Sequence, residues 1–374
     1  MSQSVIILGG GIIGLSCAYE AAKRNYKVTL IEPGRLGGQA SGAAAGMLAP
    51  YSEQLEQPDA FFQLCRQSLL MYERWTQEIE QLSKHSVGLI NCGSLYVCKH
   101  EADIQPLLTR LLWQNEWQAG MEQLEREELL QLEPQLSKDI VAGLYSPAES
   151  HVDAPQLVRA LIACCQMLRV RLIEQAGAIE AVEQTDAGIT VKYAAELKSI
   201  RAERLIVCSG AWTSLYESSF NLALPVHPIR GQICAYKNNA VTPAHLIFSA
   251  HAYWVMKTDG RLICGASEDV AGYNTETTEQ GIGRLVRASE NWLPALKRQK
   301  LYSSWAGLRP ATKDGLPLIG PIDRTGRIII AAGHYRNGIL LSPVTALIAA
   351  DLLDNHLSSS ISPFHPARFT RAAI

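Results

Sequence analysis

The sequence has 374 residues, of which 47% are apolar and 19% charged, and its formal net charge is −2 at pH 7. This length predicts two domains or one large α/β unit with an ample apolar core. The near-neutral charge argues against a nucleic-acid partner and against an anionic membrane surface, and no apolar run is long enough to span a bilayer.

The chain opens with the pattern of a βαβ unit. An apolar run at residues 5–8 predicts a buried parallel strand, a helical pattern follows to residue 24, and a second strand is predicted at residues 27–31. Gly9, Gly11 and Gly14 stand between the first strand and the helix in the spacing G-x-G-x-x-G. Glycines at these places permit a tight turn, close approach of a pyrophosphate and close packing of the helix on the strand.

Glu32 follows the second strand, where an acidic side chain can accept hydrogen bonds from the ribose of an adenosine. The N-terminus of the first helix would present free N–H groups and partial positive charge to the phosphates. Because no basic residue stands directly beside Glu32, the sequence disfavours NADP and leaves FAD and NAD open. The alternative, a glycine-rich turn without a ligand, does not explain the full order of strand, glycines, helix, strand and acid.

The next part of the chain alternates small-residue loops and helices. Residues 33–47 are rich in small side chains, and we expect a packed loop and helix start that lie against a flat ligand, with a linker as the alternative. Residues 59–82 have the spacing of a long amphipathic helix, which we interpret as structural. Further expectations are a hairpin or two short strands at 87–97, helices at 104–118 and 126–131, and an acidic, solvated face at 122–133.

The middle of the chain begins with a helix that has a clear start signal. Asp153 is a good N-cap, Pro155 stands in the first turn, and the helix is predicted to end near residue 168. A buried strand at 204–208, followed by Ser209 and Gly210, predicts a return of the chain to the first sheet. Between this helix and the strand at 204–208, further strands are predicted at 169–174, 179–183 and 189–193.

From residue 229 the pattern becomes antiparallel. Short strands are predicted at 231–236, 252–256 and 262–265, with a turn at 258–261, and a helix at 277–293. Residues 305–314, WAGLRPATKD, are aperiodic and rich in Gly and Pro, which favours a loop. The chain then shows a buried strand at 327–332, a loop at 333–339, a closing helix at 342–353 with Ser342 as cap and Pro343 at its first position, and a polar, peripheral tail after Asn355.

Candidate substrate ligands stand in the second half of the chain. Arg309 and Arg336 are both predicted in loops, where a guanidinium suits bidentate capture of a carboxylate, although a surface ion pair is the alternative for each. Tyr253 and His251 are two residues apart, so in a strand both would face one side, and core packing is the favoured interpretation of the pair. Gly333 and Gly338 bracket a possible helix-terminus site for negative charge on a reduced flavin.

No pattern supports a metal site or a covalent nucleophile. His245 and His251 are isolated, the nine cysteines include no C-x-x-C, and no G-x-S-x-G occurs. We therefore expect a reduced, cytoplasmic protein with buried thiols.

Several of these stretches together resemble the D-amino-acid oxidase family of FAD-dependent amine oxidases, and within it the glycine oxidases of thiamine-pathway type. The resemblance extends over nearly the whole chain. It rests on the glycine motif with Glu32, on AAAGML at 43–48, on His251-Ala252-Tyr253, on WAGLRPATKDGLPLIG at 305–320 and on AAGHYRNGILLSP at 331–343.

The resemblance implies an α/β fold with a Rossmann-like FAD-binding domain and an inserted antiparallel-sheet substrate domain. The implied FAD-binding segments are 1–84, 150–216 and 303–374, and the substrate-binding segments are 85–149 and 217–302. The implied reaction is oxidative deamination of glycine, sarcosine or small D-amino acids by hydride transfer to flavin, with glyoxylate, ammonia and hydrogen peroxide as products. The alternative is a dehydrogenase that passes electrons to a carrier instead of dioxygen.

The resemblance implies roles for the residues of this sequence that match positions in the family's motifs. Arg309 resembles the arginine that binds the substrate carboxylate, and Tyr253 the tyrosine over the substrate. Arg336 and His251 match positions at the entrance, and Ala49 a position that limits the pocket. The FAD-contacting positions, besides the glycine motif, are Ile12, Ile13, Glu32, Pro33, Ala40, Ser41, Ala45, Gly46, Met47, Ala178, His334, Tyr335, Arg336, Asn337, Gly338, Ile339 and Leu340.

The resemblance also bears on how FAD is held and on partners. Related sarcosine oxidases with covalent flavin carry a cysteine near the block after the substrate arginine, whereas residues 313–317 here read KDGLP. We therefore expect non-covalent FAD. A small amino acid and dioxygen are the expected partners, a homo-oligomer is possible, and neither nucleic acid nor membrane insertion is expected. A non-catalytic FAD scaffold or tRNA-modifying domain is a further alternative, which the near-neutral charge disfavours.

Overall fold

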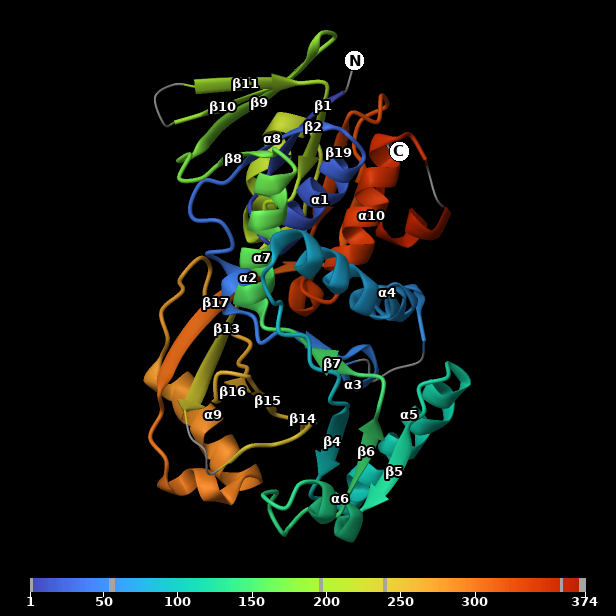
Figure 1. Ribbon diagram of the computed structural model, residues 1–374, viewed down its shortest axis with the longest axis vertical. Helices are drawn as coiled ribbons and strands as arrows, with labels where there is room; N and C mark the ends of the chain where they lie inside the picture. Colours follow the sequence, from blue (N-terminus) through green and yellow to red (C-terminus); the bar gives the residue numbers. More distant parts are fainter. Residues whose placement is uncertain (1–2, 54–57, 195–197, 238–240, 357–358, 370–374) are drawn as a thin grey trace.

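The computed structural model describes residues 3–53, 58–194, 198–237, 241–356 and 359–369. Two sheets dominate it, one in the upper and one in the lower half of Figure 1. The upper sheet has six strands in the order β18-β19-β12-β1-β2-β8. Its members are β1 (Ser4–Leu8), β2 (Lys27–Ile31), β8 (Arg171–Ile173), β12 (Arg204–Val207), β18 (Leu318–Pro321) and β19 (Ile328–Ala332).

The upper sheet is assembled from the beginning, the middle and the end of the chain. Strands β1, β2, β8, β12 and β19 run parallel, and only β18 is antiparallel to its neighbour. The prediction that residues 204–208 return to the first sheet is confirmed, because β12 pairs with β1 along its whole length. Strands β1 and β12 are almost completely buried, as expected for parallel strands covered on both faces.

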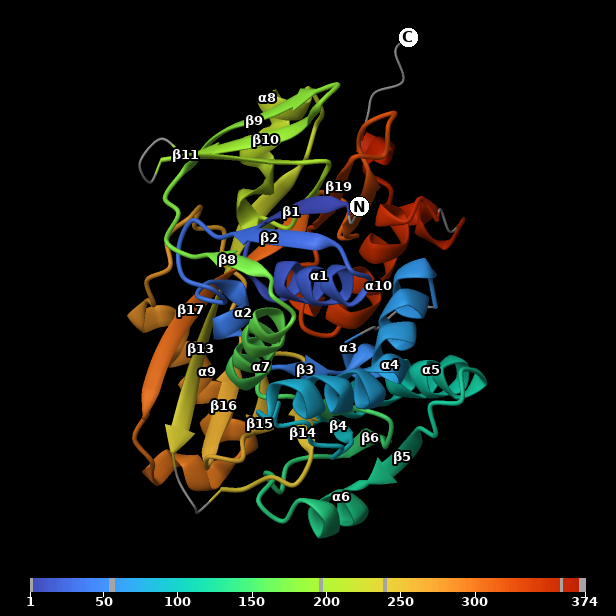
Figure 2. The same ribbon diagram turned by 45° about the horizontal axis from the view of Figure 1, so that its top comes forward.

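Helices pack on this sheet, with α1 and α10 lying side by side in Figure 2. The predicted cap at Asp153 is confirmed, because its side chain accepts a hydrogen bond from Gln156 N at 2.9 Å. The long helix predicted at 59–82 is also present, and Asp59 caps it by accepting from Phe62 N at 2.7 Å. The predicted cap at Ser342 is wrong, since Ser342 is the first helical residue and its hydroxyl donates to Ile339 O. The helices are α1 (Ile12–Lys23), α4 (Ala60–Ser83), α7 (Ala154–Met167) and α10 (Ser342–Leu353).

The lower sheet has eight strands in the order β17-β13-β16-β15-β14-β4-β6-β5. All neighbours are antiparallel except β14 and β4. The strands are β4 (Ser94–Cys98), β5 (Glu122–Glu125), β6 (Ala142–Ser146), β13 (Val226–Lys237), β14 (Leu246–Phe248), β15 (Tyr253–Met256), β16 (Arg261–Gly265) and β17 (Ser303–Thr312). The predicted helices are confirmed as α5 (Ile104–Glu116), α6 (Arg126–Leu132) and α9 (Glu279–Trp292).

The prediction of a loop at 305–314 is wrong, because these residues form most of β17, which pairs with β13 over ten residue pairs. The tertiary structure explains why this strand contains proline and glycine. Pro310 is tolerated because β17 is an edge strand, where a missing N–H breaks no ladder. Gly307 is required because a Cβ there would come within 2.7 Å of Ala43 Cβ.

Three smaller expectations also need correction. Residues 87–97 contain most of β4, which pairs with the distant β6 and β14 instead of forming a hairpin. The acidic stretch 122–133 is not solvated at its end, because Glu133 is buried and accepts hydrogen bonds from the backbone and ring of His245. The tail is not wholly peripheral, since Ile361 and Phe364 are buried in the core of the upper half.

The remaining elements are short, and several of them were not predicted. The three-stranded sheet of β9 (Ile179–Thr185), β10 (Gly188–Tyr193) and β11 (Lys198–Ala202) contains β11 in addition to the predicted strands. β3 (Met47–Leu48) pairs with β7 (Ser150–His151), and the other short helices used below are α2 (Ala40–Ala43), α3 (Pro50–Glu53) and α8 (Glu217–Phe220). None of the helices in the described part of the chain has the length and apolar character needed to cross a bilayer.

β17 bears on the proposed domain boundaries. The boundary at residue 303 would place β17 in the FAD-binding domain, whereas its hydrogen bonds connect it to the lower sheet. The division into segments therefore remains a proposal.

Candidate active site

A cavity of about 720 Å³ lies between the upper and lower sheets, within the size range of small-molecule sites. One end is lined by the loops after β1, β2 and β12, and the other by β13, β15, β17 and the loop after β19. We call these the nucleotide end and the substrate end. They differ in the chemistry that they present.

At the nucleotide end, glycines allow the backbone to fold on itself. Gly9 has φ +105°, and a Cβ there would overlap the carbonyl of Cys208. A Cβ on Gly14 would overlap the Gly9 carbonyl oxygen, so the helix could not pack where it does. The tight turn and the close packing predicted for these two glycines are confirmed, while the contact of Gly11 with a pyrophosphate stays a prediction.

The start of α1 is open toward the cavity. Its first intrahelical bond runs from Leu15 N to Gly11 O, so the preceding amides of the first turn have no carbonyl partner within the helix. Ser41 Oγ accepts one of them, from Ile12 N at 2.8 Å. Gly11, Ile12 and Ile13 line the cavity. This arrangement suits an anionic group at the helix N-terminus.

Glu32 is held at the end of β2 by two backbone amides. Its carboxylate accepts hydrogen bonds from Gly10 N at 2.7 Å and from Gly34 N at 2.9 Å. The carboxylate therefore has a fixed position on the cavity wall, beside the glycine turn. Its contact with a ribose remains a prediction.

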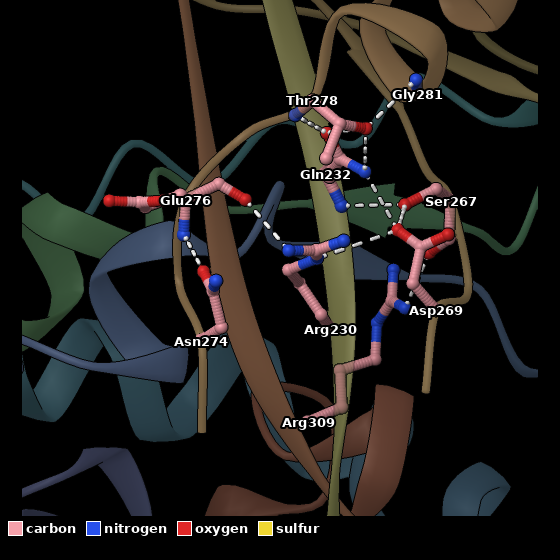
Figure 3. Close-up of polar contacts among 9 residues, drawn as sticks. All are labelled: Arg230, Gln232, Ser267, Asp269, Asn274, Glu276, Thr278, Gly281 and Arg309. Atoms are coloured by element: carbon pink, nitrogen blue, oxygen red, sulfur yellow. Dashed lines mark hydrogen bonds and ion pairs between the residues drawn. The ribbon is translucent and has the colours of Figure 1, made fainter. Parts of the chain in front are cut away.

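Arg309 reaches the substrate end from β17 and lies across Gly231 of the neighbouring β13. A Cβ on Gly231 would overlap the guanidinium, so the glycine provides the space for this side chain. Arg309 Nη1 donates to the carbonyl oxygen of Ser267 at 2.9 Å, as Figure 3 shows. The guanidinium is thus oriented by a neutral acceptor and remains positively charged toward the cavity.

The Ser267 segment is fixed by a polar network with β13 (Figure 3). Gln232 and Ser267 exchange two hydrogen bonds, of 3.0 and 3.2 Å. Asp269 Oδ2 accepts from Ser267 Oγ and from Gln232 Nε2, both at 2.7 Å. Burial acts to raise the pKa of Asp269, but these two hydrogen bonds and nearby arginines outweigh it and hold the pKa below its usual value. The network therefore contains a fixed anion and positions the carbonyl that orients Arg309.

Tyr253 lies on β15 beside Arg309 in the cavity wall. A Cβ on Gly265, its partner residue on β16, would overlap the phenol, so the ring lies flat over this glycine. Burial raises the pKa of Tyr253 to about 12, although the positive charges of Arg309 and Arg336 act in the opposite direction. The phenol is therefore a neutral hydrogen-bonding group at physiological pH.

Arg336 lies in the loop between β19 and α10, as predicted, and it pairs with two carboxylates. Nη1 lies 3.0 Å from Glu268 Oε1 and Nη2 lies 3.3 Å from Glu53 Oε1. The negative charge of Glu53 is the main cause that raises the pKa of Arg336 above its ordinary value. Two residues earlier in the chain, His334 is buried and contacts Thr345 Oγ1 at 3.0 Å. Burial lowers the pKa of His334 to about 3, so its ring is neutral.

The cavity collects most, but not all, of the predicted site residues. Ala49 is buried in an apolar cluster with Tyr253 and Phe248, behind the cavity surface. His251 is exposed and precedes β15, so the expectation that it shares a strand face with Tyr253 is wrong. Their contact with substrate stays a prediction. The predicted residues that line the cavity are Gly9, Gly11, Ile12, Ile13, Glu32, Pro33, Ala40, Ser41, Ala45, Gly46, Met47, Ala178, Tyr253, Arg309, His334, Tyr335, Arg336, Gly338 and Ile339.

Three predicted FAD-contacting residues, Gly14, Asn337 and Leu340, are not part of the cavity lining. Conversely, sequence reasoning missed Glu53, Trp212 and Gly231, which do line it. Gly231 carried a usable signal, because a glycine within a predicted strand often marks a close approach of another group. Glu53 carried none, since a single glutamate in a short helix is unremarkable.

The described cysteines and potential metal ligands form neither a disulfide nor a metal site. All nine cysteines are free thiols, eight of them buried. Among the described residues, no three His, Cys, Asp or Glu side chains gather in a way that could hold a metal ion.

Comparison with known proteins identifies relatives of the whole chain. The family described as DAO, FAD dependent oxidoreductase, matches residues 4–352. A glycine oxidase from Bacillus licheniformis is 32% identical over 349 residues, which are 93% of this chain and 92% of that protein. The bifunctional protein ThiO/ThiG of a Synechocystis species is 34% identical over 377 residues, which are 98% of this chain but only 54% of that protein.

The fold agrees with these sequence relationships. The crystal structure of glycine oxidase from Geobacillus kaustophilus superimposes with a TM-score of 0.93 at 28% identity, covering 98% of this chain and 99% of that chain. The predicted α/β architecture, with a Rossmann-like domain and an inserted sheet domain, is thereby confirmed.

Proposed function

Because this chain belongs to the DAO family of FAD-dependent oxidoreductases and is glycine oxidase-like, we propose that it oxidises glycine, and also sarcosine or small D-amino acids. The reaction converts glycine, water and dioxygen into glyoxylate, ammonia and hydrogen peroxide. Glyoxylate and ammonia arise by hydrolysis of the imine that forms when the α-carbon loses a hydride. The observation that supports this proposal most directly is the guanidinium of Arg309 at the substrate end of the cavity, which donates to Ser267 O and has no ion-pair partner among the described carboxylates.

The residues of the cavity fit FAD. The open N-terminus of α1 and the fixed carboxylate of Glu32 suit the pyrophosphate and the ribose, and the small residues of the loop after β2 leave room for a flat ring system. When bound, FAD supplies the hydride acceptor that no side chain can replace. We propose that it is held without a covalent bond, because the block after Arg309 contains no cysteine.

The substrate end would hold an amino acid by its carboxylate. Arg309 presents a guanidinium whose Nη1 is already aligned by Ser267 O, which leaves its other N–H groups for a carboxylate. Tyr253, with its neutral phenol, can donate a further hydrogen bond. Fixing the carboxylate in this way restricts the position of the α-carbon in the cavity.

Neither Tyr253 nor His334, two polar side chains of the cavity wall, is suited to abstract the α-hydrogen as a proton. The phenol of Tyr253 is protonated below about pH 12, and His334 is buried and already bonded to Thr345. Transfer of a hydride needs no such base, so neither side chain has to act as one in the proposed reaction. The amine of the substrate has to lose its extra proton on binding, since only a neutral amine can form the imine.

We also propose that the product serves thiamine biosynthesis. This proposal is supported by similarity to a protein named ThiO/ThiG, in which the related segment is part of a longer chain. A role in thiamine biosynthesis would require only that the imine or glyoxylate leaves the active site.

A direct experiment tests the proposal. The protein is purified, its visible absorption is recorded before and after denaturation, and hydrogen peroxide is measured with glycine, sarcosine and D-alanine. We expect a yellow protein that releases free FAD on denaturation and forms one peroxide per amino acid. A colourless protein that does not take up added FAD would contradict the cofactor assignment, and turnover only with an artificial electron acceptor would indicate the dehydrogenase instead.

A further inference from the structure

The two arginines of the substrate end differ in their charge partners. Arg309 donates to a backbone carbonyl, and none of the described carboxylates lies within ion-pair distance of it. Arg336 contacts the carboxylates of Glu53 and Glu268 on its two terminal nitrogens. The cavity therefore offers one uncompensated cation, at Arg309, and a second cation that is already neutralised.

Glu53 and Glu268, which contact Arg336, come from two different segments of the chain. Glu53 ends α3, lines the cavity and has a side chain that is only 12% exposed. Glu268 follows β16 and is not part of the cavity lining, and 47% of its side chain is exposed. One positive and two negative charges meet here, so the cluster formed by Glu53, Arg336 and Glu268 carries a net charge of −1.

Both glutamates are held by neighbouring residues. Glu268 stands between Ser267 and Asp269, which are tied to β13 by the network in Figure 3. The helix α3 that carries Glu53 is anchored by the buried Glu149, which accepts hydrogen bonds from Tyr51 N at 2.7 Å and Ser52 N at 2.8 Å. These contacts fix the backbone segments that carry the two glutamates beside Arg336.

We propose that Glu53 and Glu268 make the site selective for amino acids with a single carboxylate, an inference that rests on the proposed function and specifies its substrate class. A monocarboxylic substrate uses Arg309 and leaves the cluster intact. A second carboxylate that extends toward Arg336 meets the net negative charge of the cluster and has to lose its water without gaining a free cation. The cluster thus excludes iminodiacetate and D-aspartate while it admits glycine, sarcosine and D-alanine.

The test compares substrates in charge-neutralising variants of the FAD-loaded enzyme. Glu53→Gln and Glu268→Gln each remove one negative charge and keep the shape of the side chain. The matched control is Glu276→Gln, an exposed residue beyond Asp269 that does not line the cavity. We expect the ratio of kcat/KM for iminodiacetate to kcat/KM for glycine to rise by about tenfold in each variant, mainly through KM, and to stay at the wild-type value in the control.

A binding measurement covers the case in which a variant loses turnover. Acetate and malonate, which cannot be oxidised, are titrated against the visible spectrum of bound FAD. We expect malonate to gain affinity relative to acetate in Glu53→Gln and in Glu268→Gln. Unchanged ratios in both variants, or a wild-type enzyme that already prefers dicarboxylates, would overturn the selectivity proposal. Failure of wild type to oxidise any of the monocarboxylic substrates would instead overturn the proposed function.

Discussion

The two ends of the cavity are built on different principles. The nucleotide end is formed mainly by backbone groups and one carboxylate, and its glycine turn, helix start and Glu32 lie within one continuous βαβ segment. The substrate end is formed by charged and aromatic side chains from separate parts of the chain, namely Tyr253, Arg309 and Arg336. The nucleotide end depends on backbone geometry within one short segment. The substrate end depends on the net charge of side chains that segments far apart in the chain bring together.

Glycines serve both ends, but for different reasons. Gly9 and Gly14 let backbone approach backbone at the nucleotide end. Gly231 and Gly265 lie under the side chains of Arg309 and Tyr253 at the substrate end. Replacing a glycine by alanine is therefore expected to disturb the fold at the nucleotide end. At the substrate end, the same replacement is expected to change only the orientation of side chains.

The largest effect is expected for Gly14→Ala. The new Cβ overlaps the Gly9 carbonyl, so α1 has to move away from β1, and we expect a loss of about 3 kcal/mol in the free energy of unfolding together with loss of bound FAD. Urea unfolding and the flavin content of the purified protein measure both. The control is Gly283→Ala in α9, where a Cβ meets only the flexible end of Arg287. A Gly14→Ala variant as stable as wild type would contradict the view that the nucleotide end depends on close packing of backbone on backbone.

The next effect concerns Arg309→Lys. Lysine cannot make the two parallel hydrogen bonds of a guanidinium with a carboxylate, so we expect the KM for glycine to rise by a factor of about 10 to 100, corresponding to about 1–3 kcal/mol. Steady-state kinetics measure this change, and the visible spectrum should show unchanged FAD content because Arg309 belongs to the other end of the cavity. Unchanged kinetics with glycine would refute the assignment of Arg309.

A smaller effect at the same end of the cavity is expected for Gly231→Ala. The added methyl overlaps the guanidinium of Arg309, whose flexible side chain can shift, so we expect KM to rise by about tenfold with little loss of stability. A double-mutant cycle identifies the cause: combined with Arg309→Lys, the substitution should have a markedly smaller effect. Full additivity of the two substitutions would mean that Gly231 acts through something other than Arg309.

The smallest effect is expected in the pH dependence of Tyr253→Phe. A phenol with a pKa of about 12 stays protonated throughout the range from about pH 6 to 10, so it contributes no ionisation there. We expect kcat/KM to fall by about tenfold, as for one lost hydrogen bond, while the shape of its pH profile stays that of wild type. The disappearance of an ionisation from the profile would identify Tyr253 as a proton-transfer group and contradict a substrate end that acts through fixed charges.

Most of the upper half of the molecule could be predicted because its signals are local. The strands at the start, middle and end of the chain are continuous apolar runs, and the helix starts at Asp59 and Asp153 depend on residues three positions apart. The lower half was harder to predict because β17 is stabilised by its pairing with β13, some eighty residues earlier in the chain. Its glycines and prolines resemble a loop until that partner is known.

The sequence by itself determined the glycine turn, the buried parallel strands and the presence of arginines suited to a carboxylate, because each of these follows from residues that are neighbours in the chain. Only the tertiary structure decided that Arg309 has no carboxylate partner in the described part of the chain while Arg336 is paired with two, and that His251 lies outside the cavity. The physical reason is that the charge available to a ligand depends on which distant groups share the same low-dielectric space, and chain order does not encode that distance.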